Sequence, residues 1–250
     1  MDKPINHVHP AATIGENCRI GWFTVIMEHV CLGRDVTVGH NVTIYPGTVL
    51  GDGVTVGDNS VLGKQPKPAK TSTVKIEGEL PPLVIGANTI IGTGAVLYAG
   101  TTIGENCLVA DLASIREECA IADSVIIGRG VAVENQVTIG SYTKIQTGAY
   151  ITAHTTIEDH VFIAPMVTTT NDNFMGRTQE RFKHLKGPTI KKGARIGGAS
   201  ITLPGVTIAR ESFIAAGALV TKDTEPGLVY KGLPAKPARA VPPAEILTAD

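Results

Sequence analysis

Aliphatic residues recur at every sixth position along most of this 250-residue chain. The series covers residues 14–62, 85–163 and 190–220, and 28 of its 29 positions are Ile, Leu or Val, with Thr202 as the exception. An α-helix repeats about every 3.6 residues and a strand repeats on every second residue, so a period of six fits neither. The pattern therefore predicts a repeat protein made of six-residue units.

Each six-residue unit has the same internal order. Glycine often follows the aliphatic residue directly, as in IGENC and VGHNV. Four positions after the aliphatic residue stands a residue such as Cys, Thr, Val, Ser or Ala. This order predicts a short strand with two inward side chains, then a tight turn where Gly or Asn adopts a positive φ. Three strands would close a triangular coil, and coils stacked about 4.8 Å apart would pair strand with strand. We therefore predict an all-β parallel β-helix of about ten coils, in which residues 18 apart in sequence form one column.

Two interruptions and a tail break the series, and we expect a single domain over residues 1–250 that includes them. The first interruption, residues 63–84, is rich in lysine and proline, which predicts an extended loop. The second, residues 169–189, carries several basic side chains and has a possible helical turn at residues 179–185. Each is either a solvent-exposed loop without a binding role or an arm that reaches over a neighbouring subunit to hold a phosphate-bearing ligand. The tail, residues 225–250, reads as proline-rich coil.

Composition excludes several classes of partner. With 22 basic and 23 acidic residues the net charge is −1, which gives no field to attract a nucleic acid or an anionic membrane. No apolar run approaches the roughly 18 residues that a membrane helix needs, so we expect a cytoplasmic protein. The four cysteines have no CxxC spacing and are predicted to be reduced interior filler. They are Cys18, Cys31, Cys107 and Cys119.

A histidine column is the main candidate for catalysis. Stacking by 18 places His154 above Gln136, with Asp172 next if the register continues past Thr169. A carboxylate beside an imidazole is the arrangement of a general base, and an ordinary histidine pKa of about 6.5 suits that role. His154 is therefore the predicted base and Asp172 its orienting partner. The alternative is that His154 is only a polar turn residue, and His160 is a second, weaker candidate.

Polar side chains near this column are candidates for binding a substrate. Asn135 and Asn171 belong to the adjacent column, and Arg177 lies in the second interruption. Glu134 stands where the repeat usually has Gly or Ala, so it either binds an amine or hydroxyl group or is a solvated turn acid. The predicted substrate-binding residues are therefore Glu134, Asn135, Asn171 and Arg177.

The iterated motif (Ile/Leu/Val)-Gly-x-x-small-x resembles the hexapeptide-repeat family of left-handed β-helix proteins, most of which are acyltransferases. The resemblance covers residues 14–224 and supplies the expected left-handedness. The segment IKKGARIGGASITLPGVTIARESFIAAGALVTKD, followed by YKGLPAKPAR, is similar to the acetyl-CoA-binding end of that family. It implies acetyl-CoA as acyl donor, a groove of stacked small residues for its pantetheine arm, and basic residues at its nucleotide end. The groove residues are Gly198, Ala199, Ala216 and Gly217, and the basic ones are Lys222, Lys231 and Arg239.

Within that family, TTNDNFMGR and ITAHTTIEDHVFIAP look most like N-acyltransferases of nucleotide-linked amino sugars, of the 3-amino-3,6-dideoxyhexose type. The resemblance implies a homotrimer with active sites between subunits and a dTDP- or UDP-linked 3-amino sugar as acceptor. Some relatives use a protein histidine and others do not.

Three other functions remain open from the sequence. Acyl transfer to a different small amine or hydroxyl needs the same repeats. A zinc carbonic anhydrase relative needs three metal-binding histidines, and the spacing of His154 and His160 does not fit them, so no metal is predicted. A non-enzymatic scaffold would need neither the small-residue groove nor the basic C-terminal end.

Overall fold

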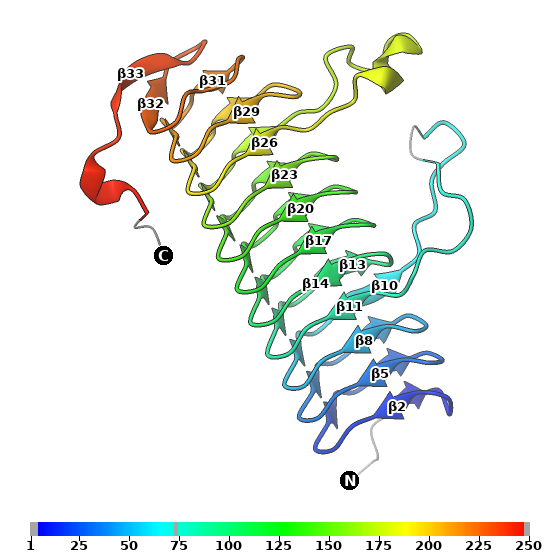
Figure 1. Cartoon of the computed structure of the whole chain (residues 1–250). Helices are drawn as coiled ribbons and strands as arrows, with labels where there is room; N and C mark the ends of the chain where they lie inside the picture. The colour runs from blue at the N-terminus through cyan, green and yellow to red at the C-terminus, as the bar shows by residue number, and fades with distance from the viewer. Residues whose placement is uncertain (1–4, 73–74, 248–250) are drawn as a thin grey trace. The chain divides into compact units, whose positions relative to one another are not determined.

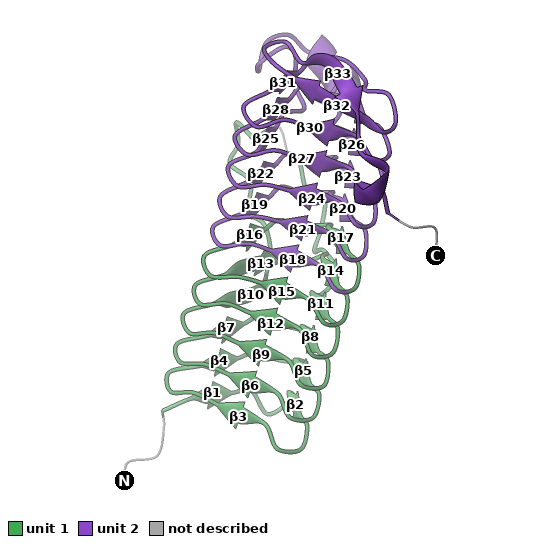
Figure 2. Ribbon diagram, turned by 90° about the vertical axis from the view of Figure 1, so that its left-hand side faces the viewer, with its two compact units in different colours: residues 1–123 green, residues 124–250 purple. Residues whose placement is uncertain are grey.

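The computed structural model describes residues 5–72 and 75–247, and nearly all of its regular structure is β-strand. The chain divides into two compact units, residues 1–123 and 124–250 (Figure 2). Most strands have two residues, one outward and one inward, because each six-residue unit turns a corner before the next begins. Among the described residues, no helix is long and apolar enough to cross a membrane.

Within its described residues, the first unit holds 17 strands in three parallel sheets. The sheet orders are β1-β4-β7-β10-β13-β16, β2-β5-β8-β11-β14-β17 and β3-β6-β9-β12-β15. The strands are β1 (His7–Val8), β2 (Thr13–Ile14), β3 (Arg19–Ile20), β4 (Val25–Ile26), β5 (Cys31–Leu32), β6 (Thr37–Val38), β7 (Thr43–Ile44), β8 (Val49–Leu50), β9 (Thr55–Val56), β10 (Val61–Lys64), β11 (Val84–Ile85), β12 (Ile90–Ile91), β13 (Val96–Tyr98), β14 (Thr102–Ile103), β15 (Leu108–Val109), β16 (Ser114–Ile115) and β17 (Ala120–Ile121).

The second unit continues the same pattern and ends in a hairpin. Its sheet orders are β19-β22-β25-β28-β31, β20-β23-β26-β29 and β18-β21-β24-β27-β30-β32-β33. Its elements are β18 (Ile126–Ile127), β19 (Ala132–Val133), β20 (Thr138–Ile139), β21 (Lys144–Ile145), β22 (Tyr150–Ile151), β23 (Thr156–Ile157), β24 (Phe162–Ile163), β25 (Thr168–Thr169), η1 (Glu180–Lys183), β26 (Thr189–Ile190), β27 (Arg195–Ile196), β28 (Ile201–Thr202), β29 (Thr207–Ile208), β30 (Phe213–Ile214), β31 (Leu219–Val220), β32 (Leu228–Lys231), β33 (Lys236–Ala240) and η2 (Pro243–Glu245).

The predicted fold class, an all-β left-handed parallel β-helix, is confirmed. Paired strands lie 18 residues apart in uninterrupted coils, as with Ile14 opposite Leu32. The inward aliphatic residues form the core, and Ile44 and Ile145 are fully buried. The number of coils is slightly higher than predicted, because the first face is passed six times in the first unit and five times in the second. The extra pass is β1, whose Val8 lies six residues before Ile14.

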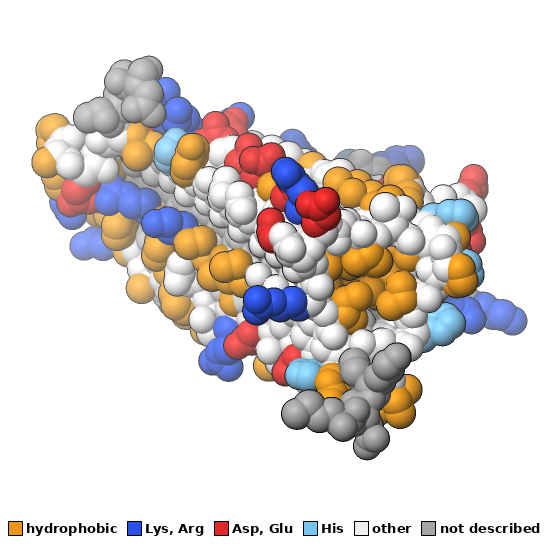
Figure 3. All heavy atoms as spheres, turned by 90° about the horizontal axis from the view of Figure 1, so that it is seen from below, with side chains coloured by type: hydrophobic (Ala, Val, Ile, Leu, Met, Phe, Trp, Pro, Cys, Tyr) orange, Lys and Arg blue, Asp and Glu red, His pale blue; other side chains and the backbone are white. Residues whose placement is uncertain are grey.

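The first coil has another coil on one side only among the described residues. Its inward side chains Val8 and Ile14 are therefore exposed, at 39% and 36%. Figure 3 views the molecule from this side and shows hydrophobic side chains gathered there. Repetition alone buries an inward residue only where coils lie on both sides of it.

Both insertions leave the coils as loops (Figure 1). Residues 65–83 lie between β10 and β11, and their described part contains no helix or strand. Residues 170–188 lie between β25 and β26 and contain η1, which confirms the predicted helical turn.

The prediction that the tail is coil is wrong. β32 pairs in parallel with β30, and β33 pairs antiparallel with β32. Val229 and Tyr230 are 8% and 7% exposed, so they bury apolar surface at the end of the last coil. Proline at Pro237 is compatible with this strand because β33 is at the edge of its sheet and needs fewer N–H donors.

The cysteines are all free. Cys107 and Cys119 are buried and Cys18 is half-buried, as filler residues would be. Cys31 contradicts the prediction, because it is exposed. It occupies the outward position of β5, next to the inward Leu32.

Candidate active site

His154 lies in the turn after β22, in the second unit. Its backbone has φ 62°, and its N–H donates to the carbonyl oxygen of Asn135 over 3.2 Å. The side chain is exposed, and within the described residues its imidazole has no hydrogen bond, ion pair or ring contact. Both ring nitrogens are therefore available to a ligand.

Asp172 does not contact His154 in this structure. Its Oδ1 accepts the N–H of Phe174 over 2.8 Å, its Oδ2 accepts the N–H of Gly176 over 3.0 Å, and Oδ2 also pairs with Arg181 Nη2 at 2.8 Å. The Gly176 and Phe174 hydrogen bonds and the Arg181 guanidinium hold the pKa of Asp172 below its usual range. The carboxylate therefore organises the second insertion and does not orient the imidazole as the stacking rule suggested.

The register that led to this expectation holds only for the strand and the residues directly after it. Thr168 lies opposite Tyr150, and Asn171 Nδ2 contacts the carbonyl oxygen of Ala153 at 3.5 Å. After Asn171 the backbone leaves the coil, and it returns at Gly187. Stacking by 18 is therefore valid to Asn171 and fails at Asp172.

The return point of the second insertion is tightly packed. A Cβ on Gly187 would lie 2.6 Å from both the backbone nitrogen and Oγ1 of Thr155. Lys186 N–H donates to the carbonyl oxygen of Asn171 over 3.1 Å, so both ends of the insertion are joined. This joint lies beside the turn that carries His154.

The interior of the second insertion is also ordered by its own contacts. Phe174 stacks on His184 with ring centroids 5.7 Å apart, and Arg181 lies over the ring of Phe182 at 5.2 Å. Arg177, predicted to bind substrate, is exposed near the tip of the loop. Sequence reasoning missed Arg181 as the partner of Asp172, because no periodic pattern relates the two positions.

The remaining predicted polar residues lie in the turn after β19. Asn135 is only 7% exposed, and Glu134 is half-buried. Asn135 is held beneath the His154 turn by the backbone hydrogen bond between them. His160 lies in a different turn, where its ring stacks on Tyr142 with centroids 4.9 Å apart.

The predicted small-residue groove is an open column. Gly217 N–H donates to the carbonyl oxygen of Gly198 over 2.8 Å, which stacks the two turns. Ala199, Ala216 and Gly217 are exposed, and a Cβ on Gly217 would meet no atom within 4 Å. Within the described residues, the N–H groups of Gly198 and Ala216 have no acceptor.

The three predicted cofactor-binding cations are divided between two places. Lys222 lines a hollow of about 330 Å³. Lys231 and Arg239 lie exposed on the hairpin of β32 and β33, and Arg239 Nη1 donates to the carbonyl oxygen of Ala240. Sequence reasoning missed Lys236, which lines the same hollow as Lys222, because the tail was expected to be coil. Tyr230 also lines it, and its hydroxyl oxygen accepts the N–H of Glu225 over 2.9 Å.

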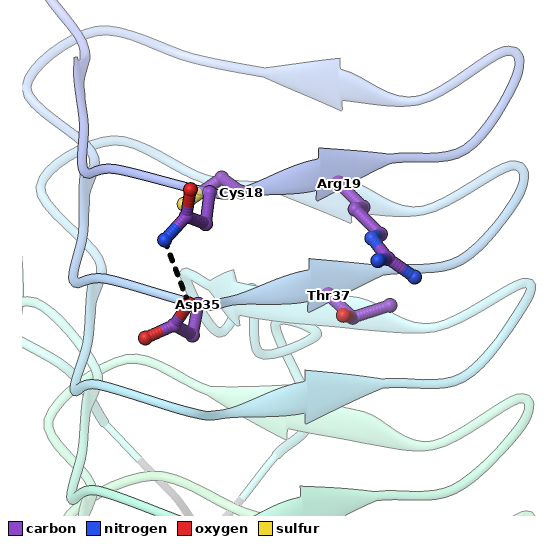
Figure 4. A pocket seen from close by; sticks show the side chains of 5 residues that line it. Cys18, Arg19, Asp35 and Thr37 are labelled. Carbon is purple, nitrogen blue, oxygen red and sulfur yellow. Dashed lines mark hydrogen bonds between the residues drawn. The ribbon is translucent and has the colours of Figure 1, made fainter.

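A larger hollow, about 560 Å³, lies in the first unit on the first two coils. Arg19 and Thr37 project from successive strands, while Asn17 donates to Asp35 over 3.1 Å (Figure 4). The hollow contains none of the predicted catalytic or binding residues.

No three His, Cys, Asp or Glu side chains within residues 5–72 and 75–247 are grouped as they would be around a metal ion. That the site needs no metal remains a prediction.

Two family models of hexapeptide-repeat transferases match parts of the chain. The bacterial transferase hexapeptide family, described by six repeats, matches residues 11–45, 32–64 and 82–117. The hexapeptide repeat of succinyl-transferase matches residues 189–222. The matches fall in both units, so each unit carries hexapeptide repeats similar to those of transferases.

A Schizosaccharomyces pombe protein named as an acetyltransferase is 50% identical over 52 residues, which are 21% of this chain. The match spans about a quarter of that relative's length, 25%. The crystal structure of LpxA, a UDP-N-acetylglucosamine acyltransferase from Bacteroides fragilis, is similar with a TM-score of 0.59 and 20% identity. An Arabidopsis UDP-N-acetylglucosamine acyltransferase gives 0.58 and 19%. Each covers 96% of this chain, which covers 74% of theirs, so the fold is shared.

Proposed function

We propose that this hexapeptide-repeat transferase is an acetyl-CoA-dependent N-acetyltransferase that acts on the amino group of a nucleoside-diphosphate-linked amino sugar. The acceptor would be a dTDP- or UDP-linked 3-amino sugar, and the enzyme would work as a homotrimer. The observation that carries the proposal is the exposed imidazole of His154, without a protein partner among the described residues, beside the second insertion. The relative named as an acetyltransferase and the open column of small residues support the donor.

In the proposed reaction His154 accepts a proton from the sugar amine as its nitrogen attacks the thioester carbonyl carbon. The carbon–nitrogen bond forms, the carbon–sulfur bond then breaks, and the CoA thiolate leaves and takes up a proton. The free N–H groups of Gly198 and Ala216 are the proposed donors to the developing oxyanion. Both the base and the donors belong to turns between strands.

The substrate-binding assignments follow the same geometry. Asn135 and Asn171 lie next to the His154 turn and are proposed to hold the sugar, with Glu134 beside them. Arg177 is proposed to meet an anionic part of the acceptor, because it is exposed on an insertion that its own contacts order. Asp172 acts indirectly, as the residue that positions this insertion. Lys222, Lys231 and Arg239 are proposed to bind the nucleotide end of CoA, together with Lys236.

A thiol-release assay with acetyl-CoA tests the activity against nucleotide-linked amino sugars, the same sugars unlinked, and hydroxyl acceptors. We expect turnover only with the nucleotide-linked amines. Turnover confined to unlinked amines would contradict a nucleotide-linked acceptor. The absence of thiol release with every acceptor would contradict acetyltransferase activity.

The base is tested separately. His154→Asn should lower kcat by about a hundredfold or more, because a positioned general base contributes on that order. His29→Asn is the matched control, since His29 occupies an equivalent left-handed turn position with φ 59° and lies in the other unit. Full kcat in His154→Asn would show that the substrate amine loses its proton without this residue.

A further inference from the structure

The coil that leads into the first insertion departs from the repeat at one residue. β10 has four residues and β13 has three, whereas the other strands of the first unit have two. The pairing of β10 with β13 shifts between Leu62 and Lys64, so that Lys64 lies opposite Tyr98. Gly63 is the extra residue of this bulge. It has φ 79° and no room for a Cβ beside Thr48 Oγ1, so only glycine fits. Bulges re-aim side chains and are frequent at functional sites.

The bulge assembles a column of two cations around one aromatic ring. Lys64 Nζ lies 5.6 Å from the centroid of the Tyr98 ring. Arg116 lies one coil further on, because Leu97 pairs with Ile115, and its Cζ is 5.4 Å from the same centroid. Without the shift in pairing, Gly63 would lie opposite Tyr98 and the first cation would be missing.

The second cation of the column is fixed in orientation. Arg116 Nε and Nη2 bind Oε2 and Oε1 of Glu117, each over 2.8 Å, and the Glu117 side chain is only 1% exposed. A two-point contact of this kind holds the guanidinium plane in place. The Arg116 side chain remains 30% exposed. The arginine is therefore positioned before any ligand arrives.

The first cation has no carboxylate partner. Within the described residues Lys64 makes no ion pair, and its only side-chain interaction is with Tyr98. The next residue, Gln65, anchors the base of the first insertion by donating to the Leu80 carbonyl oxygen over 2.8 Å and accepting the Leu80 N–H over 3.1 Å. Lys67 and Lys70 follow and are exposed. The column therefore stands at the base of a segment with excess positive charge.

We propose that Lys64, Tyr98 and Arg116 form an anion subsite that binds the diphosphate of a nucleotide ligand. Lys64 binds phosphate oxygens as a compact charge, Arg116 is preoriented by Glu117, and Tyr98 separates the two cations. The diphosphate belongs either to the nucleotide-linked acceptor or to CoA. The assignment of the diphosphate to the acceptor or to CoA rests on the proposed function. The anion subsite itself does not, because binding of a diphosphate can be measured without acyl transfer.

Isothermal titration of the full chain with inorganic pyrophosphate, dTDP, UDP and CoA tests the subsite. Lys64→Met keeps a long side chain on Tyr98 and removes the charge. We expect it to weaken binding of pyrophosphate and of one nucleotide class by about tenfold, as for the loss of a charge-assisted hydrogen bond. Lys64→Arg should restore binding to within about threefold, since it returns a cation to the column.

Arg19→Met is the matched control, because Arg19 is also a positively charged residue of the first unit, is exposed, and lies outside the column. Its binding should equal that of the wild type, and equal melting temperatures should exclude a folding defect. Weaker dTDP or UDP binding with unchanged CoA assigns the subsite to the acceptor, and the reverse assigns it to the donor. Binding within twofold of wild type for every ligand in Lys64→Met, or an equal loss in Arg19→Met, overturns the subsite. If the protein releases no thiol with any acceptor but Lys64→Met still weakens diphosphate binding, the proposed function is refuted and the subsite is retained.

Discussion

The two insertions leave the coils at equivalent corners, between a strand of the first sheet and a strand of the second, yet they are held differently. The first is anchored at its base by the neutral side chain of Gln65, which makes two hydrogen bonds to Leu80. The second is organised internally by the ionised side chain of Asp172, which makes two backbone hydrogen bonds and an ion pair with Arg181. A neutral anchor is indifferent to pH, whereas a carboxylate is not.

The difference also separates the uses of the two loops in the proposed function. The contacts of the second insertion order its own interior, including the short helix η1, so it can present Arg177 from a defined surface. The anchor of the first insertion orders its base, where the Lys64 column lies. In each case the ordered part of the loop is the part that we assign to ligand binding.

The largest effect is expected at the return point of the second insertion. Gly187→Ala places a Cβ 2.6 Å from backbone and side-chain atoms of Thr155, so the joint must shift. We expect the free energy of unfolding to fall by about 2–3 kcal/mol, as for overpacking of a dense site. Chemical denaturation measures this. Gly198→Ala is the control, because its nearest non-neighbouring atom is Pro165 O at 3.3 Å, and equal losses in the two variants would contradict the prediction.

Asp172→Ala should loosen the second insertion without unfolding the coils. The N–H groups of Phe174 and Gly176 lose their acceptor and Arg181 loses its partner. We expect hydrogen exchange of these two amides to accelerate by on the order of tenfold, with exchange in β22 unchanged. Unchanged exchange at Gly176 would show that the carboxylate does not hold the loop.

Acid should affect the second insertion and leave the first unchanged. The Gly176 and Phe174 hydrogen bonds and Arg181 hold the pKa of Asp172 below its ordinary value, so the ionised form is favoured in the folded loop. Its stabilisation is complete above about pH 3.9, the unperturbed aspartate pKa, and is lost as the pH falls through the lower folded-state pKa. The amide chemical shifts of Phe174 and Gly176 should report this titration as the pH falls below about 3.9, and that of Leu80 should not. The shift changes should be absent in Asp172→Asn.

The smallest effect is expected from Gln65→Ala. It removes two neutral hydrogen bonds at a half-exposed position, so exchange of the Leu80 amide should accelerate by about fivefold. The melting temperature should stay close to that of the wild type. A larger loss than in Asp172→Ala would reverse the order of the two anchors.

Most of the coil architecture was predictable from the spacing of aliphatic residues. The six-residue period that begins at Ile14 predicted the strands and the 18-residue pairing, and the structure confirms both. The same spacing predicted that Gly198 stacks on Ala216 and Ala199 on Gly217, and Gly217 N–H does donate to the Gly198 carbonyl oxygen. The role of these residues in binding stays a prediction. Asp172 was misplaced relative to His154, and the tail strands were missed. Both errors occur where the six-residue period has ended, so the pattern carries no information there.

By itself the sequence determined which residues face inward, because a large apolar side chain at every sixth position can be buried only if the chain turns a corner between successive ones. It also determined that His154 stands in an outward-facing turn. The tertiary structure alone decided that Asp172 binds Arg181 and the Phe174 and Gly176 amides, and that Gly63 places Lys64 against Tyr98. These contacts depend on where the backbone leaves and re-enters a coil. At those points the path of the backbone decides which side chains come close together, and the six-residue repeat does not.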